Sequence, residues 1–130
     1  MTRDQVAAAE NANADSETEF AGQHQMVFHS FVDGHSAAIT YLLENNQLRA
    51  ASYRIRNDEN RQVYAFMRDF LTRTYGAPTV QKDQLVGWRP ARSEIALTWL
   101  PDKTCYVAFW DKEYFARMNN LGTSGDTTSF

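Results

Sequence analysis

The sequence predicts an α+β domain of two layers, in which an antiparallel five-stranded sheet is ordered β-β-β-α-β-β-α and the central helix packs on one face. Residues 63–71 have helical apolar spacing. Alternating segments of strand length precede and follow them, separated by short turn signals. A length of 130 residues, 43% of them apolar, suits one domain with a core of its own.

Residues 1–22 are acidic and carry almost no large apolar side chain, so we expect a disordered leader there. The alanines favour a short helix over residues 5–11, but nothing in the sequence would hold it. A single α+β domain is expected over residues 23–121 and a frayed tail over 122–130. Excess negative charge in the leader comes from Asp4, Glu10, Asp15, Glu17 and Glu19, against Arg3 alone.

Three strands are expected next, over residues 26–32, 35–43 and 48–56. Asp33-Gly34 and Asn45-Asn46 are two-residue turn signals that set the register of the two hairpins. The first turn places Phe28 opposite Ile39. The second places Tyr41 opposite Ala50.

This register divides the side chains of the three strands between two faces of the sheet. The more apolar face carries Ile39 and Tyr41, so we expect it to meet the helix. The second face is not cleanly polar, which indicates either a cover or a contact surface. It carries Val27, His29, Phe31, Ala38, Leu42, Arg49, Ala51 and Tyr53.

The central helix is predicted between a cap at Asp58 and a stop at Tyr75-Gly76-Ala77-Pro78. Apolar residues recur at the spacing of one wide stripe. We expect four of them to be mostly buried against Ile39 and Tyr41, namely Val63, Phe66, Phe70 and Leu71.

In the second half, residues 79–87 are expected to be a polar connection, followed by strands over 94–100 and 105–110. A three-residue loop, Pro101-Asp102-Lys103, would group Ile95, Leu97 and Trp99 with Cys105, Val107 and Phe109. It also requires Lys103 to be left-handed, at a cost of roughly 1 kcal/mol. Asp111 is expected to cap a last helix that extends through Asn120.

Histidines at 24, 29 and 35 raise the question of a metal or catalytic site. The predicted register turns His29 and His35 to opposite faces, whereas a metal needs converging ligands. We therefore predict no metal and no cofactor. A small enzyme that uses His29 or His35 with Asp33 is the alternative function. Cys105 stands alone, so the chain has no intramolecular disulfide.

Aromatic and arginine side chains near strand ends suggest a binding function without catalysis. The expected partner is another protein, or a second copy of the chain, on the second sheet face. A single-stranded nucleic acid is the further alternative, disfavoured by the net charge of −3 and the lack of a lysine-rich run. The candidate binding residues are Tyr53, Tyr106, Trp110, Arg49, Arg54 and Arg56.

Tyr75-Gly76-Ala77-Pro78, then Trp88 and the strand pair after it, resembles a pattern in small uncharacterised bacterial proteins, often exported or lipid-anchored. It is also similar to outer-membrane assembly lipoproteins of the SmpA/OmlA kind. The resemblance implies a non-enzymatic envelope or interaction protein and carries over no catalytic residue. No membrane span and no secretory signal are seen as written, which fits the cytoplasm. A removed upstream signal would instead fit the periplasm or a lipid anchor.

Overall fold

A computed structural model describes residues 1–10, 14–32, 34–82 and 84–122 of the chain. This described part forms one antiparallel sheet of eight strands, ordered β1-β2-β3-β4-β8-β7-β6-β5, with three helices. The predicted α+β class and antiparallel sheet are confirmed. The predicted count of five strands is wrong, because three further strands extend the sheet at its two edges.

Five strands correspond to predicted ones: β2 (Gln23–Val32), β3 (His35–Glu44), β4 (Gln47–Ile55), β7 (Ser93–Trp99) and β8 (Cys105–Asp111). The additional strands are β1 (Ser16–Phe20), β5 (Val80–Lys82) and β6 (Leu85–Trp88). The helices are α1 (Arg3–Glu10), α2 (Gln62–Tyr75) and α3 (Lys112–Gly122).

Helix α1 and strand β1 occupy the segment that composition led us to expect as a disordered leader. Val6 anchors α1, because its side chain is 1% exposed and packs with Met26 and Phe28 of β2. The backbone amide of Leu48 donates a 2.7 Å hydrogen bond to the carbonyl of Met1. The anchor is supplied by strands far along the chain, so the local sequence does not reveal it.

A β-bulge between Leu42 and Leu43 changes the predicted register of the second hairpin. Leu43 pairs with Leu48 as the two-residue turn requires, but Tyr41 pairs with Ala51 rather than Ala50. The extra residue is Arg49 of β4, and it exchanges the two faces for the side chains that follow in that strand. Tyr53 therefore lies on the face that the helices cover, not on the second face where we predicted it.

Two other predicted registers are confirmed. In the first hairpin Phe28 pairs with Ile39, and Val32 pairs with His35 across the turn. Asp33 of that turn lies outside the described residues. In the last hairpin Leu97 pairs with Val107, and Lys103 is left-handed with φ of 67°. Burial of one continuous apolar row outweighs the backbone cost at Lys103.

Helix α2 begins at Gln62 with Arg61 at the cap position, three residues later than the predicted cap at Asp58. The buried carboxylate of Asp58 still caps it, accepting hydrogen bonds from the amides of Val63 at 2.8 Å and Tyr64 at 2.9 Å. The Asp58 side chain, from the loop before the helix, thus accepts hydrogen bonds from free amides of the first helical turn.

The buried stripe of α2 is narrower than predicted. Val63, Met67 and Leu71 are buried as a helical row, whereas Phe66 and Phe70 are each 46% exposed on its flank. The row packs on Ile55, Leu97 and Val107, not on Ile39 and Tyr41 as predicted. Ile39 and Tyr41 belong to the core under α1.

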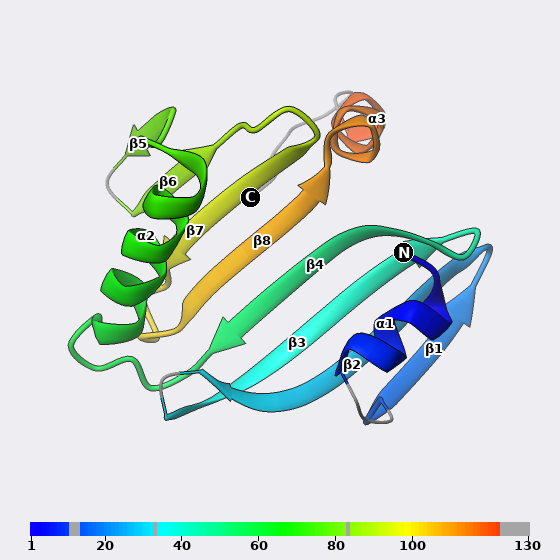
Figure 1. The fold of residues 1–130 in the computed structure, drawn as a ribbon, viewed down its shortest axis with the longest axis horizontal. Coiled ribbons are helices and arrows are strands. Elements are labelled where there is room, and N and C mark those ends of the chain that lie inside the picture. The colour runs from blue at the N-terminus through cyan, green and yellow to red at the C-terminus, as the bar shows by residue number, and fades with distance from the viewer. Residues whose placement is uncertain (11–13, 33, 83, 123–130) are drawn as a thin grey trace.

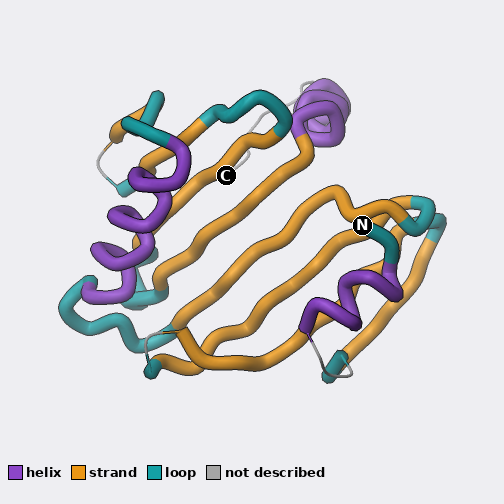
Figure 2. The backbone as a smooth tube through the Cα atoms, viewed as in Figure 1, coloured by secondary structure: helices purple, strands orange, loops and turns teal. Residues whose placement is uncertain are grey.

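Helices α1 and α2 cover the same face of the sheet at its two ends, over separate core clusters (Figures 1 and 2). Tyr53 packs against both clusters and joins them. The paired row that runs from Phe28 across the sheet to Val86 lies on this face. On the opposite face, α3 at one end is the only helix that the described residues form. We call this opposite face the open face.

Candidate binding surface

The open face presents a floor of small residues across the middle of the sheet. Alternation along the paired strands brings them together, because residues paired across strands point the same way. Around them stand the larger side chains of Leu42, Leu85, Tyr106 and Trp110. The floor consists of Ala38, Thr40, Ala50, Ser52, Gly87, Ala96, Thr98 and Ala108.

Three adjoining hollows lie on this floor, with volumes of about 500, 300 and 140 Å³. The two larger hollows share Lys82, Leu85 and Ala96, and the smallest shares Tyr106 with one and Trp110 with the other. Together they extend from Thr40 of β3 to Lys82 of β5. We call this continuous depression the groove.

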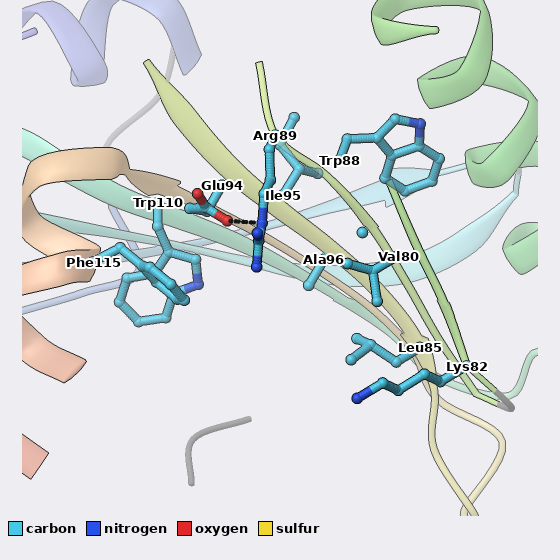
Figure 3. A pocket seen from close by; sticks show the side chains of 11 residues that line it. Val80, Lys82, Leu85, Trp88, Arg89, Glu94, Ile95, Ala96, Trp110 and Phe115 are labelled. Carbon is cyan, nitrogen blue, oxygen red and sulfur yellow. Dashed lines mark hydrogen bonds and ion pairs between the residues drawn. The ribbon is translucent and has the colours of Figure 1, made fainter. Parts of the chain in front are cut away.

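The 300 Å³ hollow has an aromatic side and an aliphatic end (Figure 3). Trp110 and Phe115 form the aromatic side, and the Arg89–Glu94 ion pair, 3.1 Å between Nε and Oε1, stands between them and Leu85. Trp110 itself stacks on Tyr114 of α3, with ring centroids 6.1 Å apart. Helix α3 therefore forms one end wall of the groove.

The 500 Å³ hollow carries two cationic side chains, Arg54 and Lys82. The guanidinium of Arg54 lies over the ring of Tyr106, 5.5 Å from its centroid, in a cation–π contact. Within the part of the chain that the structure describes, neither Arg54 nor Lys82 forms an ion pair. Among the described residues, no carboxylate therefore pairs with the positive charge at this end of the groove.

The structure brings three of the six predicted binding residues together in the groove, namely Tyr106, Trp110 and Arg54. Tyr53 points to the helix-covered face because of the bulge in β4. Arg49 approaches Glu44 at 3.8 Å and Asp111 at 3.6 Å, so it supports the fold.

Arg56, the last of the six, lies beyond the end of β4 and lines none of the three hollows. Sequence reasoning missed Lys82, Leu85, Ala96 and Phe115. Alternation over residues 85–88, with buried Val86 and Trp88 at every second position, is the signal that could have found part of this set.

The histidines at 29 and 35 lie on opposite faces of the sheet. His29 lies on the open face and bonds to Asp15, 2.7 Å between Nδ1 and Oδ2, in an exposed pair. His35 pairs with Val32 and so points to the other face, as predicted. Asp33 lies outside the described residues. Among the described residues no group of three or more His, Cys, Asp or Glu side chains could hold a metal ion.

A second group of titratable side chains lies on the helix-covered face, where the Tyr41 hydroxyl donates a hydrogen bond to the carboxylate of Glu10. Burial raises the pKa of Tyr41, and that hydrogen bond raises it further. Burial also raises the pKa of Tyr53 beside it. Both phenols therefore stay protonated at neutral pH, and the contact ties α1 to β3.

Comparison of the chain with protein-family models, curated proteins and solved structures found no match. The resemblance to exported bacterial proteins stays a prediction. None of the helices in the described ranges is long and apolar enough to cross a lipid bilayer.

Proposed function

We propose that this protein is a binding module without catalysis, and that it holds a partner protein in the groove on the open face. The observation that carries the proposal is the groove itself, where three adjoining hollows lie on a floor of small residues. The opposite face is occupied by two helices over buried cores. Within the described ranges, the open face therefore offers a partner a hollowed apolar floor that α1 and α2 do not cover.

The side chains in the groove are of the kinds that anchor protein interfaces. Tyrosine, tryptophan and arginine dominate the binding energy of such interfaces, and Tyr106, Trp110 and Arg54 line this groove. Insertion of one leucine-sized side chain would contribute about 1.5–3 kcal/mol. The small floor allows a partner to approach the strands closely.

The nucleic-acid alternative has weaker support. Stacking of successive bases needs exposed aromatic rings along a basic track. In the groove, Tyr106 already lies under Arg54, and Trp110 stacks on Tyr114.

The resemblance to exported bacterial proteins supports a role at the cell envelope.

Site-specific photocrosslinking tests the proposal. A photoreactive phenylalanine analogue at Tyr106 is expected to crosslink a partner in extracts of the source cells, and the same analogue at Phe66 on α2 is not. Ala96→Arg, which fills the groove floor, should abolish the Tyr106 crosslink, and Thr72→Arg on α2 should preserve it. Equal crosslinking from Tyr106 and Phe66 would contradict the proposal.

A further inference from the structure

We infer that the partner element in the groove is an acidic amphipathic helix, whose apolar face lies on the small floor and whose carboxylates meet Arg54 and Lys82. This inference rests on the proposed function and specifies its ligand. Three features of the groove support it: its length, its charge and the way that α3 already packs against its end.

The groove is long enough for a helix of several turns. It extends from β3 to β5, across six neighbouring strands. At roughly 4.8 Å between strands this is about 24 Å. A helix of about 16 residues covers that distance at 1.5 Å per residue. A single small ligand would fill only one of the three hollows.

Charge in the groove selects an acidic partner. The charged residues that line the hollows are Arg54, Lys82 and Arg89 against Glu94, among the residues that the structure describes. Glu94 is paired with Arg89 at 3.1 Å and approached by Lys112 at 3.9 Å. The remaining positive charge is thus concentrated at Arg54 and Lys82, although the whole chain carries −3.

The geometry at Arg54 leaves its guanidinium suited to a carboxylate. The guanidinium carbon lies over the Tyr106 ring, 5.5 Å from its centroid, and this cation–π contact positions the group. Arginine binds carboxylates edge-on with two N–H donors. Lys82 lines the same hollow and adds a second charge.

Helix α3 shows that this face accepts a helix. Its Tyr114 and Phe115 pack on Trp110, with ring centroids 6.1 and 6.0 Å away. Phe115 and Trp110 also line the groove. A partner helix beside α3 would extend this layer along the open face.

Fluorescence anisotropy with a defined probe tests the inference. The probe is a fluorescein-labelled 16-residue helical peptide with leucine on one face and glutamate on the other, and the matched peptide has lysine at every glutamate position. The glutamate peptide should bind at least about tenfold more tightly than the lysine peptide, and raising the salt concentration from 50 to 500 mM should weaken its binding.

Two double variants locate the charge effect. Arg54→Gln/Lys82→Gln should weaken binding of the glutamate peptide by about tenfold or more. Arg61→Gln/Arg73→Gln, which removes two exposed charges outside the groove, should change it less than twofold. Circular dichroism and thermal melting check that both variants are folded.

Equal binding of the two peptides, or an unchanged affinity in Arg54→Gln/Lys82→Gln, would overturn the inference. So would sedimentation that shows a dimer of the chain dissociated by Ala96→Arg, because a second copy would then be the occupant. If both peptides fail while Tyr106 crosslinks a partner protein, the acidic helix is wrong and the proposed function stands. If neither experiment detects binding, both are wrong.

Discussion

The indole Nε1 of Trp88 donates a 2.9 Å hydrogen bond to the backbone carbonyl of Gly76. This contact joins the end of α2 to β6. Gly76 has φ of 91°, and its own amide donates to the carbonyl of Thr72, so the chain leaves the helix at this residue. Trp88 is 2% exposed beneath it.

Loss of this contact should destabilise the domain. Trp88→Phe leaves the carbonyl of Gly76 without its buried donor and is expected to lower the free energy of unfolding by about 1–3 kcal/mol. Trp88→Ala, which also creates a cavity, should lower it by about 3–5 kcal/mol. Urea unfolding followed by circular dichroism measures both changes. Equal stability of Trp88→Phe and the parent protein would contradict the role of the hydrogen bond.

Val6 is expected to hold α1 on the sheet. Val6→Ala removes buried methyl groups from the core under α1 and should cost about 2 kcal/mol in the free energy of unfolding. Ala8→Ser, at an exposed position of the same helix, is the matched control. Hydrogen exchange of the α1 amides checks the result, since faster exchange is expected in Val6→Ala alone. Unchanged exchange would show that α1 is held by other contacts.

Acid should loosen the attachment of β1. Hydrogen bonds from Arg3, and then from His24, lower the pKa of the Glu17 carboxyl below its ordinary value of 4.5. A carboxyl whose pKa is lower in the folded state contributes stability above its unfolded pKa. That contribution is lost as the pH falls through the folded pKa. We therefore expect amide protection in α1 and β1 to fall as the pH is lowered below 4.5.

Glu17→Gln should remove that pH dependence. Glu19→Gln, two residues further along the same strand, should keep it. NMR spectra recorded between pH 6 and pH 3 follow the titration residue by residue. A transition that persists unchanged in Glu17→Gln would assign the effect to another carboxyl.

Cys105 should resist thiol reagents in the folded protein. Its side chain is buried, and burial, followed by the charge of Asp58, raises the pKa of the thiol to about 12. The nucleophilic thiolate is therefore scarce at neutral pH and inaccessible to solvent. Ellman's reagent should react with the chain in 6 M urea but not measurably in buffer. Fast reaction in buffer would show that β8 opens locally.

Several features of this fold follow from local sequence. The turn at Gly34 and the loop that ends at Lys103 fix which residues pair in two hairpins, because strand alternation leaves only one register that buries a continuous row. The end of α2 at Gly76 is local too, since Pro78 cannot continue a helix. Of the groove, Tyr106 and Trp110 could be predicted in this way.

Tertiary structure decided the rest, because the deciding contacts lie far apart in sequence. A one-residue bulge in β4, opposite Leu42 and Leu43, moved Tyr53 from the open face to the helix-covered face, and no local signal marks that bulge. Val6 is the one large apolar side chain of α1, and only the strands that surround it make α1 stable. Lys82 enters the groove because β5 pairs at the edge of the sheet. Local preferences of a few tenths of a kcal/mol cannot specify these features, whereas burial of whole side chains can.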